Sequence, residues 1–134
     1  MQKNLAKVAI YIRVANKETI KDEFENQKNA IDEYLKRNYG RVIGEYFVDN
    51  GYSGISLNRP GFNLLRSKLR NDEFDFVVSY DSNKISRNAF ELIVDFKKKY
   101  NIDFIFVKEN FDTSKENLFL QNFFKDNYNL NNRG

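Results

Sequence analysis

The chain has 134 residues, a length that suits one domain with a single hydrophobic core, and we expect residues 1–134 to form that one domain. It contains no cysteine and no histidine, which excludes disulfides, thiolate nucleophiles, imidazole bases and Cys/His zinc sites, and we expect no metal. The formal net charge of +3 is weakly basic, so the composition neither requires nor excludes a nucleic acid partner.

Strands and helices are predicted to alternate along the chain. Apolar, β-branched runs predict the strands, apolar residues at helical spacing predict the helices, and polar or glycine-rich stretches predict the loops. In chain order we expect a strand over 8–12, a polar loop over 16–22, a helix over 23–38 ended by Gly40, a strand over 41–48, a turn-rich loop over 49–54, a helix starting at 58–61, a strand over 74–80, a polar loop over 81–84, a helix over 87–100, a strand over 102–107, a last helix around 118–124 and a frayed tail over 127–134.

This order of elements predicts an α/β fold with three layers: a mostly parallel sheet of four or five strands, with helices on both faces. Open α/β sheets bind ligands outside the carboxyl ends of their strands, where the loops after the strands gather. The polar and charged residues expected at that edge are Arg13, Asp49, Arg59, Asn83, Lys84 and Arg87. Arginines at such an edge suit a phosphate ligand, because the planar guanidinium pairs with two oxygens and stays charged.

Four blocks of the sequence, in this order, resemble the serine site-specific recombinases, the family of resolvases, invertases and large serine integrases. Residues 11–15 resemble the family motif Tyr-x-Arg-Val-Ser, and Gln27 is similar to a glutamine of the family's first helix. Residues 49–61 resemble its Asp…Ser-Gly…Arg-Pro-Gly segment, and residues 83–88 resemble Asp-Arg-Leu-(Ser/Gly)-Arg-(Asn/Asp). The resemblance covers residues 7–124 and implies a resolvase-like catalytic domain in which one edge strand can be antiparallel.

The resemblance also implies a function, namely DNA strand exchange. In the family, the serine attacks a DNA phosphate and forms a 5′-phosphoserine link in each of four strands within a tetramer, without metal, ATP or another cofactor. The implied catalytic positions are Ala15, at the position of the serine, with Arg13, Arg59, Arg87, Asn83 and Lys84, and the implied substrate-binding positions are Tyr11, Gln27, Asp49 and Ser53.

Three of these positions depart from the family pattern. Ala15 has no hydroxyl, so no phosphoserine bond can form there. Asn83 replaces an aspartate and cannot serve as a proton donor or an anionic partner. Lys84 replaces an arginine, which keeps the charge but loses the bidentate fork. We therefore expect a recombinase catalytic domain that is inactive with this sequence.

Three interpretations stay open. The chain is the catalytic domain of an active recombinase with its serine replaced, or a natural pseudoenzyme that regulates a recombination complex through protein contacts, or a domain that binds another phosphorylated ligand. The implied partners are the phosphate backbone of DNA at a recombination site and further copies of the chain in a dimer or tetramer. We expect no membrane contact, a cytoplasmic location, a shortened last helix and no DNA-binding domain within these residues.

Several of these residues also have an ordinary structural interpretation. Arg13 would pair with Asp49, Tyr11 would only pack in the core, Gln27 would be a solvated helix residue, and Ser86 would cap the following helix.

Overall fold

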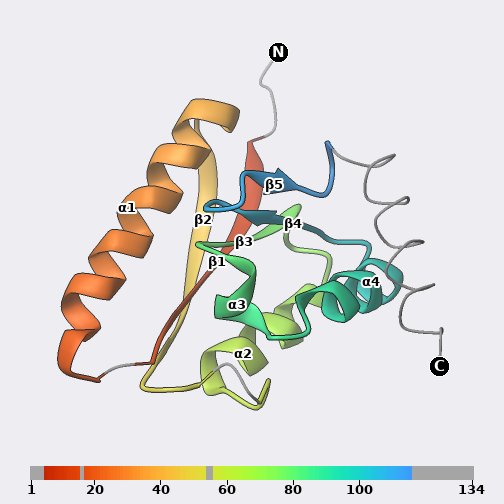
Figure 1. Cartoon of the computed structure of the whole chain (residues 1–134). Coiled ribbons are helices and arrows are strands. Elements are labelled where there is room, and N and C mark those ends of the chain that lie inside the picture. The colour runs from red at the N-terminus through yellow and green to blue at the C-terminus, as the bar shows by residue number, and fades with distance from the viewer. Residues whose placement is uncertain (1–4, 16, 54–55, 116–134) are drawn as a thin grey trace, which may run out of the picture.

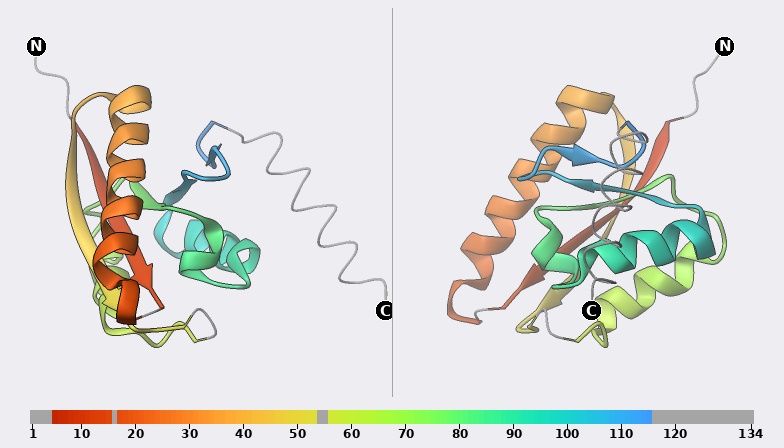
Figure 2. Two further views of the ribbon diagram at one scale, coloured as in Figure 1. Left: turned by 60° about the vertical axis from the view of Figure 1, so that its left-hand side comes forward. Right: turned by 45° about the vertical axis from the view of Figure 1, so that its right-hand side comes forward.

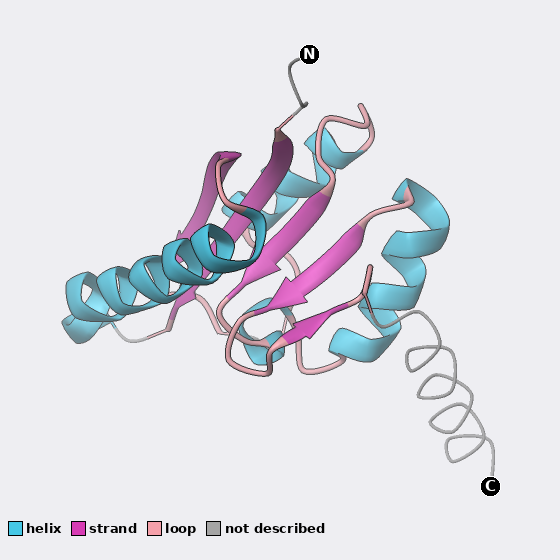
Figure 3. Ribbon diagram, turned by 90° about the horizontal axis from the view of Figure 1, so that it is seen from above, coloured by secondary structure: helices cyan, strands magenta, loops and turns pink. Residues whose placement is uncertain are grey.

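The computed structural model describes residues 5–15, 17–53 and 56–115. Its strands form one five-stranded sheet in the order β2-β1-β3-β4-β5 (Figure 3). The strands are β1 (Ala6–Val14), β2 (Val42–Asn50), β3 (Phe76–Ser79), β4 (Asp103–Phe106) and β5 (Phe111–Asp112). The first four are parallel to one another, and β5 is antiparallel to β4. This confirms the mostly parallel sheet with one antiparallel edge strand.

Helices cover both faces of this sheet (Figures 1 and 2). The helices are α1 (Ile20–Tyr39) on one face and α2 (Pro60–Leu69), α3 (Ser82–Ile85) and α4 (Ala89–Tyr100) on the other, with a short 3-10 helix, η1 (Lys17–Thr19), before α1. Side chains of β1 alternate between the two layers, so Ile10 packs beneath α1 and Tyr11 packs beneath α2. Both faces of β1 are therefore buried, which explains the unbroken apolar run over residues 8–12.

Two predicted loops are helical in the structure. The loop expected over 16–22 is wrong from residue 17 onwards, because η1 and the first turn of α1 occupy it. Ile20 packs against the sheet there, and acidic Asp22 suits the first turn of a helix. The loop expected over 81–84 contains α3, since the Asp81 side chain accepts a hydrogen bond from the Lys84 amide at 3.0 Å and caps this turn.

The remaining boundaries lie close to the predicted ones. Gly40 ends α1 as predicted, with φ of +72° and its amide bonded to the Lys36 carbonyl at 3.1 Å. The helix expected around 118–124 and the tail over 127–134 lie outside the described residues. Within the described part of the chain, no helix combines the length and the apolar character needed to cross a membrane.

Candidate active site

The predicted site residues lie at the carboxyl edge of the sheet. β1 and β2 run in parallel, and their register places Arg13 opposite Asp49 near the ends of both strands. β3 ends beside them at Ser79 and leads directly into the segment 81–88. The sheet order β2-β1-β3 therefore brings together three loops that are far apart in the sequence.

Asp49 joins the end of β2 to the start of α2. Its buried carboxylate accepts hydrogen bonds from the Tyr11 hydroxyl at 2.7 Å and from the amides of Gly61 and Phe62 at 2.7 and 3.0 Å. These two amides belong to the first turn of α2, where a negative charge is favoured. A Cβ at position 61 would lie 2.8 Å from the Val48 carbonyl oxygen, so this close approach requires glycine.

Tyr11 is fully buried, and its hydroxyl is part of a chain of hydrogen bonds. It donates to Asp49 and accepts from Nη1 of Arg59 at 3.0 Å. Burial, followed by the hydrogen bond to Asp49, raises the pKa of Tyr11 well above its ordinary value. The phenol therefore stays protonated and acts as a fixed donor. The expectation that Tyr11 only packs in the core is incomplete.

Arg59 is 1 % exposed and points into the protein. Its guanidinium lies 5.4 Å from the ring centre of Tyr11 and 5.3 Å from that of Phe62. Nη1 also donates to the Lys84 carbonyl at 3.1 Å, and Nη2 donates to the Ile85 carbonyl. Nε is buried without an acceptor among the described residues.

Arg13 is 7 % exposed and binds the same segment from β1. Nε donates to the Lys84 carbonyl and Nη2 to the Asn83 carbonyl, both at 2.8 Å, and Nη1 donates to the Tyr52 carbonyl at 2.9 Å. Burial and the neighbouring charge of Arg59 lower the pKa of Arg13. The structural alternative, an ion pair of Arg13 with Asp49, is wrong, because each of them has other partners in the described structure.

Gln27 is buried against the end of β1, so its interpretation as a solvated helix residue is wrong. Its Nε2 donates to the Arg13 carbonyl at 3.1 Å, which ties α1 to the backbone two residues before Ala15. Its Oε1 has no partner among the described residues. Apolar residues on one face of the predicted helix indicated that this position faces the sheet, but not which backbone atom it binds.

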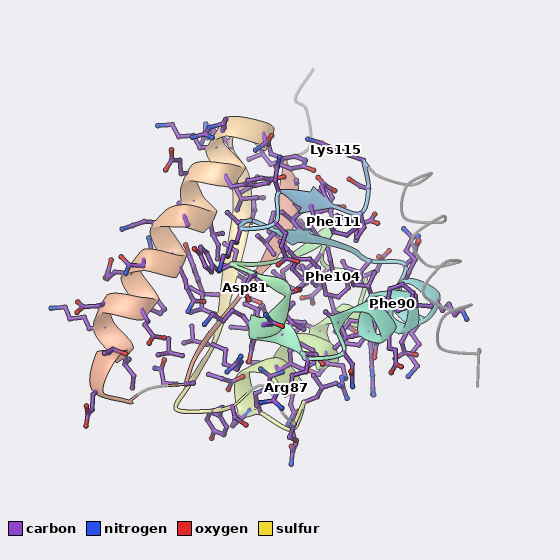
Figure 4. The ribbon with its side chains drawn as sticks, in the orientation of Figure 1. Asp81, Arg87, Phe90, Phe104, Phe111 and Lys115 are labelled. Carbon is purple, nitrogen blue, oxygen red and sulfur yellow. The ribbon has the colours of Figure 1, made fainter. Side chains whose placement is uncertain are left out.

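The other predicted site residues reach the surface. Ala15, Ser53, Asn83 and Arg87 are exposed and Lys84 is half-buried. Figure 4 shows Arg87 at the turn between α3 and α4. Ser86 does not cap α4 directly; its hydroxyl accepts from the Asn88 amide at 3.0 Å, and Asn88 is the residue that precedes the helix.

The site therefore has an inner and an outer layer of cations. Arg13 and Arg59 form the inner layer and fix the backbone of residues 83–85, while Lys84 and Arg87 form the outer layer and face solvent. The sequence did not indicate the roles of the Tyr52 and Ile85 carbonyls, since every residue has one, whereas Asp81 carried a recognisable helix-capping pattern. Among the described residues, no cluster of three acidic, histidine or cysteine side chains is arranged to hold a metal.

Comparisons with known proteins show which proteins this chain is similar to. The family described as "Resolvase, N terminal domain" matches residues 8–125. A Bacillus subtilis (strain 168) protein described as "Putative DNA recombinase" is 33% identical over 112 residues, which is 81% of this chain but only 22% of that relative's length.

Solved structures show the same similarity. The N-terminal catalytic domain of TP901-1 integrase has a TM-score of 0.77 and 32% identity, covering 91% of this chain and 94% of its own. A resolvase family site-specific recombinase from Streptococcus pneumoniae shares the fold, with a TM-score of 0.66, 23% identity and coverage of 94% and 92% of the two chains.

Proposed function

The chain belongs to the resolvase N-terminal domain family, and from this premise we propose that it is the catalytic domain of a serine site-specific DNA recombinase that lacks its nucleophile. The observation that carries the proposal is the position of Ala15. This residue is exposed, directly follows β1, and lies two residues beyond the carbonyl that Gln27 holds. A methyl group at this position cannot attack a phosphate, so the first step of strand cleavage is absent with this sequence.

The substrate of the site is the DNA backbone. Lys84 and Arg87 are the predicted site cations that solvent reaches, and they are the groups that first contact a DNA phosphate. Arg13 and Arg59 position the loop that carries them and add positive potential beneath it. A direct contact of either buried arginine with phosphate requires it to give up its bonds to backbone carbonyls.

The sequence at the site also supports a second candidate function, that of a pseudoenzyme within a recombination complex. Asn83 and Lys84 depart from the family pattern in addition to Ala15, so restoring a hydroxyl alone does not restore the whole pattern. In this function the chain associates with further copies or with an active relative and contributes protein contacts instead of chemistry.

The substitution Ala15→Ser separates the two functions, with Ala15→Gly as a matched control without a hydroxyl. Each variant is incubated with fragmented genomic DNA of its source and denatured, and DNA covalently attached to the protein is sequenced. Adducts at a defined site with the serine variant alone support an inactivated recombinase. No adduct, together with co-purification of a recombinase, supports the pseudoenzyme. If the serine variant forms no adduct, and the protein binds neither DNA nor a recombinase, both functions are overturned.

A further inference from the structure

A cavity of about 470 Å³ opens between α2 and α4, on the face of the sheet that α2, α3 and α4 cover. Its charged lining residues are Arg66 from α2, Arg70 directly after α2, and Glu91, Asp95 and Lys99 from α4. None of these residues takes part in the hydrogen-bond network that holds residues 83–85. The cavity is therefore a separate feature of the surface.

Arg66 is the unusual residue of this cavity. Its half-buried guanidinium lies 5.5 Å from the ring centre of Phe62 and 5.8 Å from that of Phe96. Nε is buried without an acceptor, and within the described ranges no hydrogen bond or ion pair holds the rest of the group. Leaving a charged donor partly desolvated and unpaired costs free energy, and an oxyanion bound in the cavity would offset this cost.

The carboxylates that line the cavity do not supply this anion. Asp95 pairs instead with Lys99, at 3.2 Å. Glu91 is exposed in the first turn of α4, and no ion pair joins it to Arg66 in the described part of the chain. The guanidinium thus stays unpaired even though two carboxylates line the same cavity.

The position of the cavity favours a DNA phosphate as the anion. Ser86 lines both this cavity and the neighbouring groove that contains Arg87. At the other end, Arg70 and Lys99 also line a third cavity together with Lys98. Arg66, Arg70 and the lysines of the last turn of α4 therefore lie in sequence from the first cavity to the third, away from the candidate active site.

We propose that the cavity between α2 and α4 binds a phosphate of the DNA backbone outside the cleavage position, with Arg66 as its main ligand. This proposal rests on the proposed function, because it requires DNA at the Arg87 turn. It adds a second contact that positions the DNA without reading its sequence.

Arginine side-chain NMR tests the two contacts separately, because Nε–H signals of Arg66 and Arg87 can be assigned by substitution. The whole chain is titrated with a short DNA duplex of arbitrary sequence and, separately, with inorganic phosphate. Shifts of both signals with DNA support the proposal. A shift of Arg87 alone overturns the cavity contact but keeps the proposed function, and a shift of Arg66 with inorganic phosphate alone overturns the assignment to DNA. No shift with either probe overturns the cavity contact, and the absence of a DNA shift at Arg87 counts separately against the proposed function.

The salt dependence of DNA binding gives an independent measurement. Arg66→Met keeps an apolar chain over the two phenylalanine rings, and Arg37→Met on α1 is the matched control. The affinity of the parent chain for DNA falls between about 50 and 200 mM salt. Without one phosphate contact, this fall should be about 3.5-fold smaller in Arg66→Met than in the parent chain. Glu91→Gln should raise the affinity for DNA, whereas Arg66→Met lowers it, because Glu91→Gln removes a negative charge from the cavity. Equal salt dependence of Arg66→Met and the parent chain would overturn the proposal.

Discussion

Arg59→Met is the sharpest test of the inner cation layer. Methionine retains much of the buried volume but makes none of the hydrogen bonds of the guanidinium. The Ile85 carbonyl loses the donor that the structure gives it, at a cost of about 1–3 kcal/mol, whereas the Lys84 carbonyl keeps its bond from Arg13. Loss of the cation contacts with the Tyr11 and Phe62 rings adds about 1–2 kcal/mol. We expect the free energy of unfolding to fall by about 2–5 kcal/mol.

Urea unfolding followed by circular dichroism measures this change. Arg37→Met is the control, because Arg37 is exposed and, among the described residues, pairs only with Glu33 on the same helix, so its loss should stay within about 0.5 kcal/mol. Arg59→Lys keeps the charge without the planar fork, so its free energy of unfolding should lie between those of the parent and Arg59→Met. A loss below about 1 kcal/mol for Arg59→Met would refute the conclusion that this arginine holds the 83–85 backbone.

Two further substitutions test the Asp49 junction. Tyr11→Phe removes the hydrogen bond to Asp49 and should cost about 1.5–3 kcal/mol in urea unfolding. The folded state holds the pKa of Tyr11 above the unfolded value of 10.0, so the contribution of Tyr11 to stability is complete below pH 10.0 and is lost as the pH rises past it. Tyr11→Phe should therefore flatten the decline of the free energy of unfolding at alkaline pH. An unchanged decline would contradict the raised pKa of Tyr11. Gly61→Ala forces a Cβ against the Val48 carbonyl and should cost about 1–3 kcal/mol, so a fully stable variant would contradict the close approach of β2 and α2.

The sequence predicted the elements well where apolar patterning is strong. The unbroken apolar run over residues 8–12 indicated a strand, and Pro60 marked the start of α2. It failed where short polar segments form helical turns, at η1 and at α3. In those turns one capping bond or one packed side chain, such as Ile20, outweighs the polar composition of the segment.

The sequence also predicted which residues gather at the candidate site, but not the direction in which their side chains point. Arg13 and Arg59 were expected at the phosphate because arginine is the usual ligand there. In the structure both are buried and bind carbonyls, whereas Arg87, taken from the same pattern, reaches solvent. Residue type and order do not separate these cases, since the acceptors are main-chain atoms with no sequence signature.

By itself, then, the sequence determined the alternation of strands and helices, the order of the motifs and the missing hydroxyl at Ala15, because each of these depends on local patterning or on residue identity. Only the tertiary structure decided that two arginines serve the protein's own backbone. Arg13 reaches carbonyls 70 and 71 residues away along the chain, and these become neighbours only because β3 pairs with β1 in the sheet.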